Sequence, residues 1–216
     1  MLAYPFFMVL LLGSYDRDTY FLLRELKEAL SRDFHGEGVY VFLLDNIELF
    51  EVENERTGFV IVELQENGET HAFFFDHSGE PIEEFEITQY GDKAQLSQKL
   101  YQSLTERLGL NVRVSPFTVL DKLDKLIDMA GLIIVVRDKE ETRGGELVEL
   151  TCCVLRGLGE KVCFMRREGI DLSSMVLELL DQARVVMRSY RDKDKLIQEV
   201  LRYTRHRIRD FRRELS

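Results

Sequence analysis

The chain has 216 residues, of which 45% are hydrophobic, so it can form one sizeable core or a domain with an elaboration. Its net charge of −10 argues against general binding to nucleic acid, whose phosphates attract basic surfaces. Its three cysteines have neither metal-ligand spacing nor the pattern of a disulfide framework, which favours free thiols in a reducing cytoplasm.

Charge is distributed unevenly along the chain. Residues 37–92 contain fifteen acids and one base, whereas residues 184–213 contain eleven bases and four acids. We expect these segments to meet, within one chain or between subunits, and we therefore expect a homo-oligomer. The 31% of charged residues and the four asparagines are typical of thermophilic proteins.

The chain begins with an apolar run. Residues 6–12 predict a buried strand, because the run is too short to cross a bilayer and has no basic segment before it, so we expect no membrane anchor. The turn at residues 13–16 offers room for a phosphate or a sugar, but it lacks the GxGxxG pattern of dinucleotide-binding folds.

The first strand and the next two predicted elements form a βαβ unit. Residues 19–33 have apolar side chains at helical spacing, and residues 39–44 predict a second buried strand that ends at Asp45.

The pattern then changes to short alternating segments, which predict an antiparallel β-meander. Asn67-Gly68 is a strong hairpin-turn signal between two of them. We interpret residues 47–91 as an insertion into an α/β domain made of residues 1–46 and 92–216. The predicted strands of the insertion are residues 47–53, 58–64, 70–76 and 82–87.

The α/β pattern resumes after the meander. Residues 92–108 predict a helix, 112–114 a short strand and 118–129 another helix.

The stretch from residue 131 to residue 153 is the most informative one. Residues 131–136 are apolar and β-branched without a charge, which indicates a strand buried on both faces. A polar loop, the pair Gly144-Gly145 and a helical pattern follow. Because α/β sheets bind ligands at the carboxyl ends of their strands, beside helix N-termini, this unit is a candidate binding site.

Two carboxylates, Glu146 and Glu149, lie three residues apart in the first turns of this helix. Acidic residues in a first turn commonly complement the helix dipole, and this structural role remains open for both. Glu149 lies further into the helix, where the dipole effect fades, and is the better functional candidate.

The end of the chain predicts further alternation of strands and helices. Residues 161–165 and 184–187 are expected strands, and 171–182 and 192–213 expected helices. The arginines of the last helix are expected to form a solvated or subunit-facing surface, since no aromatic residues are interleaved for base stacking. The whole pattern predicts an α/β fold with a mostly parallel, doubly wound (flavodoxin-like) sheet of about five strands.

Gly145-Glu146-Leu147-Val148-Glu149 and the small residues after it resemble the nucleoside 2-deoxyribosyltransferase family and its Toll/interleukin-receptor-like relatives. The motif in that group is strand, polar loop, Gly-(Thr or small)-x-x-Glu and helix. Glu146 stands where the family usually has Thr. The resemblance covers residues 6–45 and about 112–213.

The resemblance implies that Glu149 attacks or stabilises the anomeric carbon of a nucleoside ribose, that the first loop holds the sugar, and that Asp138 lies where a second acid would be sought. A carboxylate suits an oxocarbenium-like centre, as in glycosidases. No cofactor and no metal are expected. The site residues that we infer are catalytic Glu149 and Asp138, and substrate-binding Gly13, Ser14, Tyr15, Asp45, Gly144, Gly145 and Glu146.

Three hypotheses about function remain open. The chain is an N-glycosidic bond enzyme, a hydrolase or deoxyribosyltransferase that acts on a nucleoside, nucleotide or NAD-like substrate. Alternatively, it is a nucleotide-binding sensor without turnover, or an oligomeric interaction protein whose acidic and basic segments pair.

Overall fold

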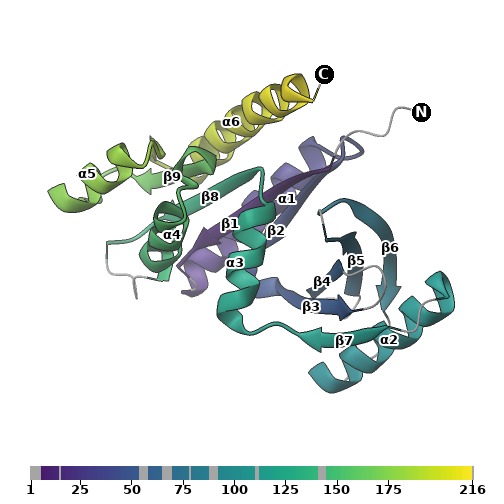
Figure 1. Cartoon of the computed structure of the whole chain (residues 1–216). Coiled ribbons are helices and arrows are strands. Elements are labelled where there is room, and N and C mark those ends of the chain that lie inside the picture. The colour runs from purple at the N-terminus through teal and green to yellow at the C-terminus, as the bar shows by residue number, and fades with distance from the viewer. Residues whose placement is uncertain are drawn as a thin grey trace. The chain divides into compact units, whose positions relative to one another are not determined.

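The computed structural model describes residues 6–14, 16–53, 58–64, 70–77, 79–87, 92–109, 112–140 and 145–215. The chain folds into two compact units (Figure 1). Unit 1 consists of Met1–Asp45 and Leu126–Ser216, and unit 2 consists of Asn46–Lys125. No helix in the described part of the chain is long and apolar enough to cross a membrane.

Unit 1 is built on a parallel sheet of five strands in the order β10-β9-β8-β1-β2. Inside the sheet, Leu10 of β1 lies beside Phe42 of β2 and Ile133 of β8. The uninterrupted apolar sequences of β1 and β8 suit this position, because both of their faces are buried. The strands are β1 (Phe7–Gly13), β2 (Val39–Leu43), β8 (Leu132–Arg137), β9 (Val162–Arg167) and β10 (Val186–Tyr190).

Helices cover both faces of this sheet. Helices α1 (Arg17–Asp33) and α6 (Lys193–Glu214) share one apolar cluster with alternate residues of β1, such as Val9 and Leu11. The intervening Leu10 points to the opposite face and is also fully buried. Helix α4 (Gly145–Leu155) packs against β1 and β8. The unit also contains α5 (Ser174–Gln182), the end of α3 (Val119–Met129) and two short 3₁₀ turns, η1 (Leu44–Asn46) and η2 (Gly159–Lys161).

Unit 2 is an antiparallel sheet of five strands in the order β6-β5-β4-β3-β7. Helix α2 (Lys93–Leu108) buries Leu96, Leu100 and Leu104 in one cluster with phenylalanines of the sheet. The helix starts at Asp92, whose carboxylate accepts from the amide of Gln95 at 2.9 Å, and ends at Gly109 with a left-handed φ of 66°. The strands are β3 (Ile47–Glu53), β4 (Gly58–Leu64), β5 (Thr70–Asp76), β6 (Pro81–Ile87) and β7 (Arg113–Pro116).

The predicted α/β class with a parallel sheet and a separate antiparallel meander is confirmed. The unit that contains the meander is larger than the predicted insertion at 47–91, because it extends to Lys125 and includes α2 and β7. We assigned the short strand expected at residues 112–114 to the α/β domain. The corresponding strand, β7, instead pairs antiparallel with β3 in the meander sheet. Unit 2 includes α2 because a sheet must cover its apolar face, and this helix does so here. The hairpin turn at Asn67-Gly68 lies outside the described residues.

Candidate functional site

The carboxyl ends of the five parallel strands meet at one edge of unit 1. From β1 the chain crosses to β2 on one side, while β8 lies on the other side of β1. The order of the strands therefore reverses between β1 and β8. In open α/β sheets ligands bind in the crevice outside the carboxyl ends at such a point.

The connection from β1 to α1 forms one side of this crevice. A Cβ on Gly13 would lie 3.0 Å from the carbonyl oxygen of Val136 in β8, so a side chain here would crowd the neighbouring strand. Ser14 is buried and hydrogen-bonds to Asp16. The Asp16 carboxylate caps α1 by accepting from the amide of Thr19 at 3.3 Å and from its hydroxyl at 2.7 Å.

Lys139, two residues after β8, joins the two sides of the crevice. Its Nζ donates to Asp16 at 2.8 Å and to Asp18 at 2.7 Å. Burial raises the pKa of Asp16, but the hydrogen bonds from Lys139, Thr19 and Ser14 outweigh it and hold the pKa well below its usual range. Sequence reasoning did not single out Lys139, which stood in a charged loop without a distinguishing pattern.

Glu146 is engaged in a buried ion pair. Arg137, the last residue of β8, donates to its carboxylate at 3.1 Å and also to the carbonyl of Glu140 at 3.2 Å. The Glu146 side chain is completely buried and that of Arg137 is 10% exposed. This ion pair links the start of α4 to the end of β8. Glu146 therefore has a more specific structural role than compensating the helix dipole.

Glu149 lies one turn further along α4 and is only 7% exposed. Its charge acts on the neighbouring Cys153: burial above all, and then the charges of Cys152 and Glu149, raise the pKa of the Cys153 thiol to about 12. A carboxylate of this burial is unusual on a helix surface, since glutamates are seldom buried unless they are paired or functional.

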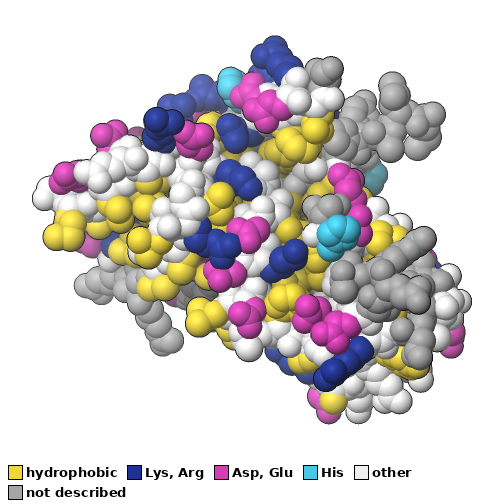
Figure 2. All heavy atoms as spheres, viewed as in Figure 1, with side chains coloured by type: hydrophobic (Ala, Val, Ile, Leu, Met, Phe, Trp, Pro, Cys, Tyr) yellow, Lys and Arg dark blue, Asp and Glu magenta, His cyan; other side chains and the backbone are white. Residues whose placement is uncertain are grey.

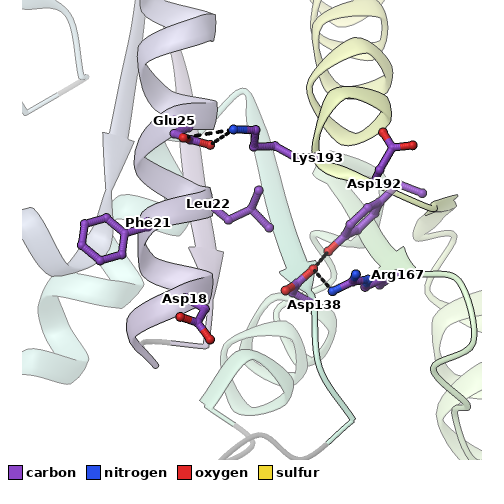
Figure 3. A pocket seen from close by; sticks show the side chains of 9 residues that line it. Asp18, Phe21, Leu22, Glu25, Asp138, Arg167, Asp192 and Lys193 are labelled. Carbon is purple, nitrogen blue, oxygen red and sulfur yellow. Dashed lines mark hydrogen bonds and ion pairs between the residues drawn. The ribbon is translucent and has the colours of Figure 1, made fainter.

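A pocket of about 270 Å³ opens at the same edge, between the first turns of α1, the N-terminus of α6 and the ends of β8, β9 and β10 (Figure 3). Figure 3 shows the ion pair of Glu25 and Lys193 at one end of the pocket and that of Asp138 and Arg167 at the other. The lining residues are Asp18, Phe21, Leu22, Glu25, Asp138, Arg167, Tyr190, Asp192 and Lys193.

Asp138 is held by two partners. The hydroxyl of Tyr190 donates to its Oδ1 at 2.9 Å, and the Arg167 guanidinium lies 3.7 Å from the same oxygen. Burial, followed by the charge of Asp138 and this hydrogen bond, raises the pKa of Tyr190 far above its ordinary value, so the hydroxyl remains a donor. Asp138 is the one inferred site residue among those that line this pocket.

The other inferred residues lie around the same edge. Gly13 ends β1 and Ser14 follows it, Asp45 is exposed just after β2, and Gly145 begins α4. Tyr15 and Gly144 lie outside the described residues. Arg167, Tyr190 and Lys193 were missed as pocket residues, because their strands and helix carry no motif that marks them.

The arginines of α6 are largely neutralised within unit 1. Arg205 lies 2.6 Å from Asp33, and Arg212 lies 3.0 Å from Glu37. Figure 2 shows acidic side chains among the basic ones there. The described residues contain no cluster of three or more His, Cys, Asp or Glu side chains that could hold a metal.

The sequence matches no model of a known protein family and no curated protein. The geometry of the carboxyl edge is therefore the basis for inferring the function of this protein.

Proposed function

We propose that unit 1 is an N-glycosidic bond enzyme, a hydrolase or deoxyribosyltransferase, that acts on a nucleoside, nucleotide or NAD-like substrate through Glu149. The observation that carries the proposal is a buried glutamate in the helix that starts at the strand-order reversal between β1 and β8. Counted within unit 1, the strand order is 2-1-3-4-5, which supports a flavodoxin-like, doubly wound sheet.

The two helix carboxylates have different tasks in this proposal. Glu146 neutralises Arg137 in the interior and holds the start of α4 in place. Glu149 supplies the negative charge at the anomeric carbon, where an oxocarbenium-like centre develops as the bond to the base breaks. Asp138, fixed by Tyr190 at the rim, contacts the substrate.

Incubation of the protein with a panel of nucleosides, nucleotides and NAD, followed by chromatography for free base, tests the proposal. We expect Glu149→Gln to lower the rate roughly a thousandfold, since it removes the charge but keeps the size of the side chain. Glu160→Gln is the matched control, because Glu160 is an exposed glutamate paired with Arg184. Turnover by Glu149→Gln at the wild-type rate would contradict the mechanism.

A sensor without turnover is the second candidate, since the mixed-charge pocket can bind a ligand whether or not a bond is cleaved. A ligand that raises the melting temperature while no base is released, even after long incubation, favours the sensor and rejects the enzyme.

We also propose that the protein is a homo-oligomer. Large apolar side chains are exposed on α4 and α5, with exposed fractions of 63% for Val148, 80% for Leu155 and 79% for Met175. Figure 2 shows hydrophobic side chains gathered over this part of unit 1. Because α6 pairs most of its arginines within unit 1, apolar contact is the better source of affinity. A monomer in light scattering at roughly tens of micromolar would count against it.

A further inference from the structure

The size of the pocket restricts what enters it. At about 270 Å³ it lies slightly below the roughly 300–1,000 Å³ of pockets that enclose whole drug-sized ligands. It therefore accommodates one ring-sized polar group, while the rest of a larger ligand stays outside.

The charge of the pocket restricts the ligand further. Four carboxylates, those of Asp18, Glu25, Asp138 and Asp192, and two cations, Arg167 and Lys193, line it. An anionic group such as a phosphate would meet an excess of like charge. A neutral group rich in hydroxyls meets acceptors and donors side by side.

Asp138 has an acceptor available for such hydroxyls. Both of its contacts in the described part of the chain, with Tyr190 and Arg167, are made through Oδ1. Tyr190 is 2% exposed and belongs to the core between the sheet and helices α1 and α6, so it fixes the orientation of the carboxylate. The second carboxylate oxygen of Asp138, Oδ2, is therefore held in a fixed orientation.

Arg167 offers donors beside that acceptor. Its distance of 3.7 Å from Asp138 is longer than a hydrogen bond, and its guanidinium makes no hydrogen bond to any other described residue. The side chain is 51% exposed at the pocket. A carboxylate and a guanidinium next to each other match two vicinal hydroxyls, which donate to the one and accept from the other.

We propose that Asp138 and Arg167 bind the 2′,3′-diol of a ribosyl group, and that the protein selects ribonucleosides, ribonucleotides or NAD-like molecules over 2′-deoxy compounds. An acidic residue near a strand end binds the ribose 2′-hydroxyl in dinucleotide-binding folds by the same chemistry. The inference rests on the proposed function and names its substrate class, and it favours the hydrolase over the deoxyribosyltransferase, whose substrates lack the 2′-hydroxyl.

Binding of four ribonucleosides and their 2′-deoxy counterparts to the full chain, measured by calorimetry, tests this inference. The Glu149→Gln variant replaces the wild type if the wild type releases base. We expect at least one ribonucleoside to bind roughly tenfold or more tightly than its 2′-deoxy form, because a hydrogen bond to a charged group is lost.

Two variants and one control assign the preference to the proposed residues. Asp138→Asn and Arg167→Gln should reduce it to roughly threefold or less. Arg202→Gln should retain it, because Arg202 is paired with Glu199 on α6 and does not line the pocket. Since Arg167 is half exposed, its variant should fold even if Asp138→Asn does not.

Equal binding of both forms, no binding of either at roughly millimolar concentration, or a preference that survives in both variants would overturn the inference. Its failure is distinct from failure of the proposed function. A ribose preference without base release leaves this inference standing and rejects the enzyme. Equal binding of both forms together with base release rejects this inference and leaves the proposed enzyme standing.

Discussion

The two units place their charged side chains differently, although each is built on five strands. In unit 1 all strands run in one direction, so five connections begin at one edge. There Arg137 meets the start of α4, Asp138 meets Tyr190 just before α6, and Lys139 meets the start of α1. In unit 2 adjacent strands are antiparallel, so successive strands end at opposite edges. Strand direction thus determines where polar side chains can gather.

A buried ion pair of unit 1 and an exposed ion pair of unit 2 show the same difference. Arg137 and Glu146 of unit 1 are 10% and 0% exposed, whereas Arg113 and Glu53 of unit 2 are 78% and 51% exposed. The interior of unit 2 is instead apolar, with phenylalanines packed on the leucines of α2. Unit 2 therefore depends on packing, and unit 1 combines packing with buried charge.

The largest expected effect tests the packing of unit 2. Phe74→Ala should destabilise the protein by about 4 kcal/mol, because Phe74 is 1% exposed and its loss leaves a cavity. Urea denaturation measures the loss, and hydrogen exchange should accelerate in β4 and β5 more than in β1 and β8. Phe21→Ala, at a phenylalanine 48% exposed on α1, is the control and should have a much smaller effect. Equal acceleration of hydrogen exchange in both units would show that unit 2 does not depend on packing more than unit 1 does.

The next effect tests the buried charge of unit 1. Glu146→Gln should cost about 3 kcal/mol, because Arg137 would remain buried with its charge uncompensated. Glu53→Gln in unit 2 should change stability by less than about 1 kcal/mol, since its pair with Arg113 is exposed. Equal losses for the two variants, measured by thermal and urea unfolding, would remove the distinction between the units.

The smallest effect concerns the pH dependence of the crevice. The pKa of Asp16 is lowered in the folded protein, so its contribution to stability is present above its unfolded value near 3.8 and is lost as the pH falls below it. Lys139→Met should reduce stability at neutral pH only slightly, because Lys139 and Asp16 are both about one-third exposed and solvent screens their attraction. The difference from wild type should shrink on acidification below about pH 4.

The Asp16 carboxyl group itself provides the measurement for this last variant. Its titration by NMR should move to higher pH in Lys139→Met. A difference in stability that is constant from neutral to acidic pH would show that Lys139 acts without affecting the titration of Asp16.

Much of the parallel sheet could be predicted from the sequence, because the apolar runs of β1, β2, β8 and β9 are local patterns that identify strands buried on both faces. The last strand was displaced: it was expected at 184–187 and occupies Val186–Tyr190. Its residues Met187, Arg188 and Ser189 are exposed, so the alternation that marks a buried strand is missing there.

The sequence by itself determined the α/β class, the separate meander and the grouping of Asp138, Glu146 and Glu149 in one connection. Only the tertiary structure decided that Glu146 pairs with Arg137 and that β7 joins the meander sheet. It also brought Lys139 to Asp16 across 123 positions and Tyr190 to Asp138 across 52. The physical reason is that the periodicity of side chains shows which face of a single helix or strand is buried. Residues distant in the chain meet only where the order and direction of the strands bring them together.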